Sequence, residues 1–459
     1  MTTPLPHGFR IAIDPGTKRL DDRTLFGGSP GRVVRLSDAG VAAYAALRDG
    51  PVATRAAGIL ARRLTDGGLA HPVPPVVASP EVTVIVPVRD RAELLDRCLA
   101  ALDRKHPVLV VDDASTDRAG IADVAARHGA TLVRRDHNGG PGAARNTGLT
   151  HATTDLVAFL DSDCVAPPGW VAALAAHFAD PLVAAVAPRI TAVPSTTSAG
   201  RYSQVAGSLD LGDRAARVVP GTRVAYVPTA ALLVRRPAPC TAFDPALRYG
   251  EDVDLVWRLH ADGGRVRYDP AVRVAHHEPT TWPALLRRRF EYGTSAGQLA
   301  LRHPRALAPL VLLPWPTVAV AGLLSRKPLV AGLATAAATV DVARQLRKAG
   351  VPPTGAPKAA LTAVHQTWLG VGRYGTQFAA PLLVAALTRR GWGRRAAVVS
   401  LLLGRPLSTW LSRRPGLDPV RFTIGAVADD VVYGCGVVVG SARAHTTRPL
   451  RPTVVWRRR

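Results

Sequence analysis

Cysteine is scarce in this chain of 459 residues, and its four cysteines lie far apart. Cys98, Cys164, Cys240 and Cys435 form no Cys-x-x-Cys pair, the spacing typical of many zinc sites and redox motifs. We therefore expect neither a zinc site nor a disulfide scaffold, and reduced thiols fit a cytoplasmic protein. Residues 1–10 contain no long apolar run, so we also expect no secretion signal.

Acidic residues are few in the C-terminal part of the chain. Residues 285–459 contain 26 Lys/Arg against five Asp/Glu, a surplus of +21, whereas residues 1–284 contain 32 against 29. A basic region of this size can bind nucleic acid, but neither interleaved aromatic residues nor a reading motif is present. The cations instead flank apolar runs, a pattern typical of segments attracted to anionic lipid. We predict an anionic membrane surface as partner and no nucleic acid, with solvated surface charge as the alternative.

The apolar runs in this part are short or interrupted. Residues 306–324 carry no charge but contain three prolines, and the uncharged run 328–340 has 13 residues, whereas a spanning helix needs about 20. Arg326 and Lys327 lie between them, where a spanning hairpin would place them outside, against the positive-inside tendency. An interfacial or re-entrant pair is therefore an equal alternative to true spans. Three shorter runs fit buried helices or strands equally well: 378–388, 396–404 and 431–442.

The chain is 47% hydrophobic and 20% charged, which indicates a folded protein of two or three domains. Prolines concentrate in residues 71–80 and mark a stiff linker. We predict a small α+β domain over residues 1–71, the linker over 72–80, a large domain over 81–295, and a basic, apolar, mostly helical region over 296–459.

The large domain alternates continuous apolar segments with amphipathic ones, which predicts an α/β fold with a mainly parallel sheet covered on both faces. In such folds ligands bind at the carboxyl ends of the strands. The expected strands are 82–86, 108–111, 131–134, 156–160 and 183–187. The expected helices are 92–103, 119–128, 142–151 and 170–178.

Polar motifs follow the first two expected strands. Pro87, Val88 and Arg89 end the first, and Asp112 and Asp113 end the second. A carboxylate at a strand end can accept the imide N–H of a uracil, so we predict that all five residues contact a nucleotide sugar. For the acidic pair alone, a capped turn before the next helix is the alternative.

A glycine-rich segment, residues 138–148, opens the third expected helix. Glycines allow close backbone approach, and a helix N-terminus favours phosphate. We predict that Gly142 and Arg145 contact the donor, with Arg145 reaching its diphosphate or neighbouring carboxylates. Taken alone, the segment would be interpreted as a structural turn.

The fourth expected strand runs directly into Asp161-Ser162-Asp163. Two carboxylates at i and i+2 past a strand end can address one divalent cation and a ribose. Mg²⁺ or Mn²⁺ takes one or two carboxylates together with substrate phosphate oxygens, and it stabilises a departing nucleoside diphosphate. We predict both aspartates as metal ligands, with Asp161 also near the sugar nucleotide. An isolated Asp-x-Asp is more often a solvated loop.

Two further groups lie downstream. Glu251, Asp252 and Asp254 open an expected helix, where acidic residues often only compensate the helix dipole. Glycosyl transfer, however, needs a base for the acceptor hydroxyl, and we predict Asp252 as that base with Glu251 beside it. His276 ends a later strand and is predicted as a third metal ligand, in preference to His277 because it continues the alternation of the strand.

These motifs, in this order, resemble the family 2 glycosyltransferases over about 200 residues. The resemblance implies a GT-A fold and an inverting, single-displacement transfer from a nucleotide sugar. At the matching positions it implies Asp113 on the base, Asp161 near ribose and metal, Asp163 on the metal and Asp252 as the catalytic base.

The whole chain is similar, more narrowly, to the glycosyltransferases of mycofactocin biosynthesis. This similarity implies a hexosyltransferase that adds glucose from UDP-glucose, as a β-linked oligosaccharide, to a peptide-derived redox cofactor. It also implies a winged-helix-like or peptide-recognition domain over residues 1–71, with a purely structural or oligomerisation role as the alternative. From the basic, apolar region and the missing secretion signal we predict that the protein works at the cytoplasmic face of the membrane. The Gln-x-x-Arg-Trp helix of polysaccharide synthases is missing, which disfavours a channel-forming synthase.

Two other functions stay open at this point. One is a rhamnosyl- or galactofuranosyl-like transferase acting on a lipid-linked acceptor in the cell envelope, which the basic apolar region favours. The other is a peptide-binding scaffold without catalysis, against which the intact Asp161, Asp163 and Asp252 argue.

Overall fold

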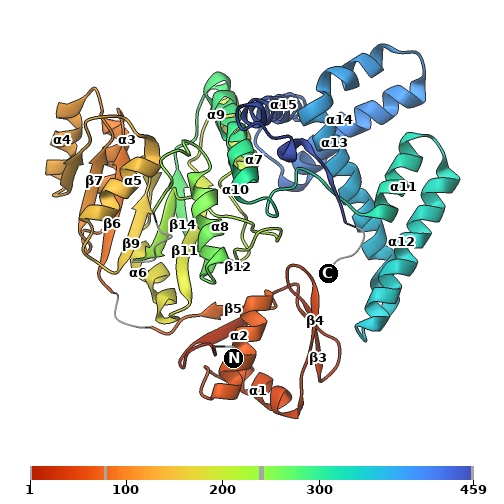
Figure 1. Cartoon of the computed structure of the whole chain (residues 1–459), viewed down its shortest axis with the longest axis horizontal. Helices are drawn as coiled ribbons and strands as arrows, with labels where there is room; N and C mark the ends of the chain where they lie inside the picture. Colours follow the sequence, from red (N-terminus) through yellow and green to blue (C-terminus); the bar gives the residue numbers. More distant parts are fainter. Residues whose placement is uncertain (1–2, 77–79, 237–241, 456–459) are drawn as a thin grey trace. The chain divides into compact units, whose positions relative to one another are not determined.

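The computed structural model describes residues 3–76, 80–236 and 242–455 (Figure 1). The chain divides into two compact units, of which the first comprises Met1–Val193 and Ser208–His277 and the second comprises Pro194–Gly207 and Glu278–Arg459. The second unit thus begins before residue 296 and takes in a short stretch from within the large predicted domain. The boundaries inferred from the sequence remain predictions, and residues 77–79 of the predicted linker lie outside the described part of the chain.

The N-terminal part of the first unit is a small α+β fold. Strands β2, β3 and β4 form an antiparallel sheet, and β1 pairs antiparallel with β5. Both helices begin at capping hydroxyls, because Ser37 accepts a hydrogen bond from the amide of Gly40 and Thr54 accepts one from that of Ala57. The elements are β1 (Arg10–Ile13), β2 (Lys18–Arg19), β3 (Thr24–Gly27), β4 (Arg32–Arg35), α1 (Asp38–Asp49), α2 (Arg55–Gly67) and β5 (Ala70–Val73).

Ion pairs tie this part to the rest of the first unit, and the pair between Arg62 and Asp180 is buried. The guanidinium of Arg62 on α2 donates to both oxygens of Asp180, at 2.7 and 2.8 Å, and both side chains are almost completely buried. Asp66 pairs with Arg265 at 2.9 Å and with Arg217 at 3.3 Å. Removing one partner of such a pair leaves a buried charge without compensation, which costs about 3–5 kcal/mol. The charges therefore fix how α2 packs here.

A nine-stranded sheet forms the centre of the first unit, in the order β10-β14-β11-β13-β9-β6-β7-β8, with β12 paired to β14. The five strands expected from the sequence are present as β6, β7, β8, β9 and β11, and the α/β fold class is confirmed. Strand β13 runs antiparallel to both of its neighbours, β9 and β11. The strands are β6 (Val82–Val88), β7 (Val108–Asp112), β8 (Thr131–Arg134), β9 (Leu156–Leu160), β10 (Cys164–Val165), β11 (Val183–Ala192), β12 (Ala216–Arg217), β13 (Ala231–Arg235) and β14 (Arg265–His276).

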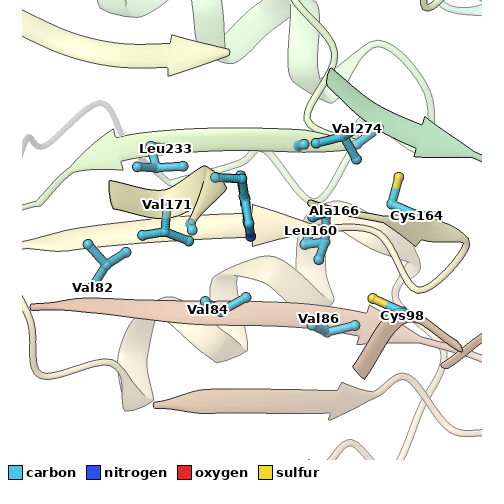
Figure 2. Packing of buried hydrophobic residues seen from close by; sticks show 14 of the residues in the cluster. Val82, Val84, Val86, Cys98, Leu160, Cys164, Ala166, Val171, Leu233 and Val274 are labelled. Atoms are coloured by element: carbon cyan, nitrogen blue, oxygen red, sulfur yellow. The ribbon is translucent and has the colours of Figure 1, made fainter. Parts of the chain in front are cut away.

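Helices connect these strands and bury the apolar side chains of the sheet. Figure 2 shows Val84 of β6, Leu160 of β9 and Leu233 of β13 gathered with Val171 of α6, and all four are buried. The thiols of Cys98 and Cys164 in the same core are free, as is Cys435, whereas Cys240 lies outside the described residues. The helices of the first unit that follow the linker are α3 (Ala92–Ala100), α4 (Arg118–Arg127), α5 (Gly140–His151), α6 (Trp170–Ala175) and α8 (Glu251–Ala261).

The second unit is mainly helical. The uncharged runs noted in the sequence lie in helices, except that the first run contains β15 at residues 311–312 and becomes helical only from Pro314 onward. Helix α13 is kinked at Ala379, two residues before Pro381. Its elements are α7 (Ser198–Ala206), α9 (Trp282–Thr294), α10 (Ala296–Arg302), β15 (Val311–Leu312), α11 (Pro314–Leu324), α12 (Pro328–Lys348), α13 (Ala356–Thr388), α14 (Trp392–Arg413), α15 (Pro419–Arg443) and β16 (Thr453–Val454).

Helix α15 is the central helix of this unit. Among the described residues it is the one helix long and apolar enough to cross a membrane by length and composition. Near its middle, however, Asp429 pairs with Arg289 of α9 at 2.9 Å, and Asp430 pairs with Arg373 of α13 and Arg405 of α14 at 3.1 and 2.9 Å. Neighbouring helices therefore neutralise both carboxylates.

Candidate active site

A cavity of about 430 Å³ opens at the carboxyl ends of β6, β7 and β9. Such an edge is where ligands bind in open α/β sheets. Six residues that the sequence analysis proposed line it: Pro87, Val88, Arg89, Asp113, Asp161 and Asp163. The other lining residues are Asp90, Arg91, Asn138, Gly140, Pro141, Ala144, Ser162 and Arg248.

The two aspartates at the end of β7 have different roles. Asp112 is buried and accepts a hydrogen bond from the amide of Ser115 at 2.9 Å, so it stabilises the turn. Asp113 accepts from Arg135 Nε at 2.9 Å, from the Gly139 amide at 3.0 Å and from the Gly140 amide at 2.7 Å. A carboxylate can accept about four hydrogen bonds, so Asp113 keeps one acceptor position, on Oδ2.

The N-terminus of α5 therefore already holds a carboxylate, that of Asp113. Gly140 has a φ of +83°, a backbone conformation in which a residue with a side chain would be strained. Its amide donates a hydrogen bond to the Asp113 carboxylate. Gly142 does not line the cavity, and a Cβ added there would lie 3.2 Å from Phe243 Cβ and 3.4 Å from Glu251 Cγ. In this structure the glycines bring protein groups close to the start of the helix.

Arg145 joins two of the proposed functional carboxylates. Its side chain is buried, and it donates to Asp161 Oδ1 at 2.6 Å and to Glu251 Oε1 at 2.9 Å. Burial disfavours its charge, but the two carboxylates outweigh burial and raise the pKa of Arg145 above its ordinary value. The sequence left two partners open for Arg145, the diphosphate of the donor or neighbouring carboxylates. The structure contains the contact with carboxylates.

Strand β10 brings the Asp-x-Asp segment to the end of β14, where Cys164 pairs with His276 across the two strands. Asp163 Oδ1 lies 3.4 Å from His276 Nε2, and Asp163 Oδ2 accepts from Arg91 Nη1 at 2.6 Å. The potential ligand atoms of Asp163, Cys164 and His276 all lie within 4.8 Å of one another. Asp161 does not belong to this cluster within the described part of the chain.

This donor set fits a divalent cation of the Mg²⁺ or Mn²⁺ type. Asp163 and His276 offer a carboxylate and an imidazole, and waters and phosphate oxygens would complete the coordination. Burial and the charges of Asp163 and Asp161 raise the pKa of the Cys164 thiol well above its usual value.

Three carboxylates stand at the start of α8, which follows Gly250 at a φ of +78°. Glu251 pairs with Arg145, and Asp254 pairs with Arg258 at 2.8 Å. Asp252 is the least buried of the three and accepts a hydrogen bond from the amide of Val253 at 2.7 Å. Burial raises the pKa of Asp252, while burial and the charge of Asp252 raise the pKa of Glu251 to about 7. A carboxylate with a raised pKa is suited to accept a proton near neutral pH.

Three arginines of the site are not among the residues predicted from the sequence: Arg91, Arg135 and Arg248. Arg91 directly follows the first motif, and Arg248 directly precedes the segment that opens α8, so their position in the sequence was the one available signal. Their partners come from distant segments, since Arg91 contacts Asp163 and Arg135 contacts Asp113.

Comparisons with known proteins identify the family. Residues 83–239 match the family model described as glycosyl transferase family 2. Over 98% of this chain and 99% of the relative, the chain is 37% identical to the pre-mycofactocin glycosyltransferase of Mycobacterium tuberculosis. It is also 28% identical to a succinoglycan biosynthesis protein of Rhizobium meliloti, over 41% of this chain and 60% of the relative.

Among solved structures, the chain is similar to a mannosyltransferase from Pyrobaculum calidifontis, which was solved in complex with GDP-Man and Mn²⁺. That likeness has a TM-score of 0.45 and 19% identity, and it covers 81% of this chain and 89% of the other.

The mixed α/β sheet, the ordered motifs at its carboxyl edge and the matching family model define a glycosyltransferase of the GT-A fold. The chain belongs to glycosyltransferase family 2 and, through its full-length similarity to a relative, to the pre-mycofactocin glycosyltransferases within it.

Proposed function

We propose that this protein transfers glucose from UDP-glucose to a hydroxyl group of a mycofactocin precursor, with inversion at the anomeric carbon. The observation that carries the mechanism is the position of Asp252 beside the Arg145–Asp161–Glu251 cluster, with its pKa raised. The acceptor and the sugar rest on the full-length relative and on the family resemblance.

The donor would bind in the cavity at the ends of β6, β7 and β9. The free acceptor position of Asp113 is suited to the imide N–H of a uracil, while Pro87, Val88 and Arg89 provide the adjoining wall. Asp161 would face the ribose. Asp163 and His276, with Asp161 nearby, would hold Mg²⁺ or Mn²⁺, which supplies Lewis-acid stabilisation of the departing diphosphate.

Asp252 would act as the general base. The acceptor oxygen attacks the anomeric carbon and forms the new glycosidic bond, while the bond from that carbon to the diphosphate oxygen breaks. The hydroxyl proton moves to Asp252, and UDP leaves with the bonding electron pair. One displacement inverts the anomeric configuration, so an α-linked donor gives a β-linked product.

We also propose that the protein works at the cytoplasmic face of the membrane and that its N-terminal domain recognises the peptide-derived acceptor. The basic second unit supports the membrane site. The same feature favours one second candidate function, transfer to a lipid-linked acceptor of the cell envelope.

The test offers the purified protein UDP-glucose with Mn²⁺ and, separately, a synthetic mycofactocin precursor or an envelope lipid extract. Mass spectrometry should detect hexose additions on the precursor, and NMR of the product should show β linkages. Hexose on the lipid alone would select the second candidate. An α linkage would contradict single displacement, and exclusive use of another nucleotide sugar would contradict the donor.

A further inference from the structure

Two helix turns of the second unit lie against each other. One joins α11 to α12 at Arg326 and Lys327, and the other joins α13 to α14 at residues 389–391. A Cβ added at Gly393, the second residue of α14, would lie 2.6 Å from Arg326 Cζ, so the guanidinium of the first turn packs on the backbone just after the second. Both turns belong to the teal-to-blue helices of Figure 1.

Cations crowd this pair of turns, in a stretch of the sequence that contains few acids. Asp341 is the one acidic residue between Glu291 and Asp418 in the sequence, and it lies 14 positions beyond Lys327. The six cations are all exposed: Arg326, Lys327, Arg389, Arg390, Arg394 and Arg395. We call these six residues, together with Trp392, the basic turn surface.

Large apolar side chains emerge at the same turns. Trp392 lies between the two arginine pairs and is 85% exposed, while Leu329, just after the first turn, is 75% exposed. Leu382, on the last part of α13, is 73% exposed. Tryptophan is enriched where its ring can sit at lipid headgroup level, and each cation near an anionic leaflet contributes about fivefold in affinity.

We propose that the basic turn surface is where the second unit docks on an anionic bilayer, with Trp392 at headgroup level and the six cations against lipid phosphates. This inference rests on the proposed membrane association and specifies its contact surface. The aliphatic side chains favour lipid over nucleic acid, because leucines gain nothing from a charged sugar-phosphate backbone. Docking is peripheral in this proposal, because the two carboxylates near the middle of α15 are paired with arginines of neighbouring helices.

The experiment measures co-sedimentation of the full-length protein with vesicles of phosphatidylcholine alone or with 30% phosphatidylglycerol. R394Q/R395Q should weaken binding to the anionic vesicles by about 30-fold, and W392A by about tenfold. The matched control R55Q/R63Q removes the same charge from the exposed face of α2 in the first unit and should change binding less than threefold. Circular dichroism checks that each variant folds.

The outcomes separate the surface from the membrane association. Equal weakening by R394Q/R395Q and R55Q/R63Q would overturn the basic turn surface and leave a general charge effect. Full binding by both W392A and R394Q/R395Q would place the contact elsewhere on the protein. Failure of the parent protein to prefer anionic vesicles would overturn the membrane association itself, and tighter binding to duplex DNA than to vesicles would identify a nucleic-acid surface.

Discussion

Arginines serve opposite purposes in the two units. At the cavity of the first unit, Arg145 bridges Asp161 and Glu251, and Arg91 contacts Asp163. On the turns of the second unit, six cations lie together in a stretch of sequence almost without acids. A paired arginine positions a carboxylate and adds little net field, whereas a cluster of unbalanced cations creates a long-range attraction to anions. Most of the net charge of +24 therefore lies in the second unit and not at the site.

The largest effect is expected at the site of the first unit, from removal of the metal ion that Asp163 would hold. Chelation should reduce transfer to background, and Mn²⁺ or Mg²⁺ should restore it, because the diphosphate leaving group then regains its Lewis acid. Asp163→Ala should lose both transfer and metal-dependent donor binding, as measured by calorimetry with UDP-glucose. Full activity of this variant in excess chelator would remove Asp163 from the metal site.

The next largest effect is expected at Asp252. Asp252→Asn keeps the shape of the side chain but removes its basicity, so transfer should fall by about 10²–10⁴-fold. Donor affinity should stay near that of the parent, which distinguishes this variant from Asp163→Ala. If donor binding is lost while turnover at saturating donor survives, Asp252 is a binding residue, and the base must be sought at Glu251 or Asp254.

The pH profile should report the raised pKa values at the start of α8. A base works when deprotonated, so a raised pKa means that kcat/KM increases with pH in a range above the ordinary aspartate value of about 4. Glu251, with a pKa of about 7, adds a like charge on losing its proton. The charge of Asp252 helps to raise the pKa of Glu251, so Asp252 loses its proton while Glu251 is still neutral. Glu251→Gln keeps that neutral form and should therefore leave the acid limb in place. A limb near pH 4 in the parent would mean that Asp252 is not the perturbed base.

The smallest expected effect concerns Arg91, whose guanidinium holds one oxygen of Asp163. Arg91→Gln should free that oxygen and tighten Mn²⁺ binding about fivefold in the absence of donor, the scale of one partly exposed ion pair. Calorimetric titration with Mn²⁺ measures this, and Arg104→Gln, an exposed arginine after α3, is the matched control. Unchanged Mn²⁺ affinity in Arg91→Gln would show that this pair does not compete with a cation.

Local patterns predicted those parts of the fold that depend on local physics. Strands β6 to β9 and β11 are continuous apolar segments because they are covered on both faces, and that signal is visible in the sequence. Strand β13 carries the same signal, but its antiparallel direction depends on strand pairing between distant segments. The amphipathic helices between the strands were predictable for the same reason as the strands.

The functional site also has parts that local sequence predicts and parts that depend on contacts between distant segments. The Asp-x-Asp segment and the acidic start of α8 stand at element ends, where the sequence placed them. The different roles of Asp112 and Asp113 could not be predicted, because they depend on which hydrogen-bond donors lie near each carboxylate in the folded protein. The same holds for Arg91, whose partner lies 72 positions away.

The Asp113 carboxylate has a consequence for how the cavity selects its occupant. It holds the end of β7, Arg135 and the first amides of α5 in one place through three hydrogen bonds that need no nucleotide. The conformational freedom of this wall is therefore given up during folding and not on binding, which lowers the entropic cost of binding. A wall that is rigid before binding selects among nucleotide bases by excluding those that do not fit the one remaining acceptor position. It does not change its conformation to accommodate them.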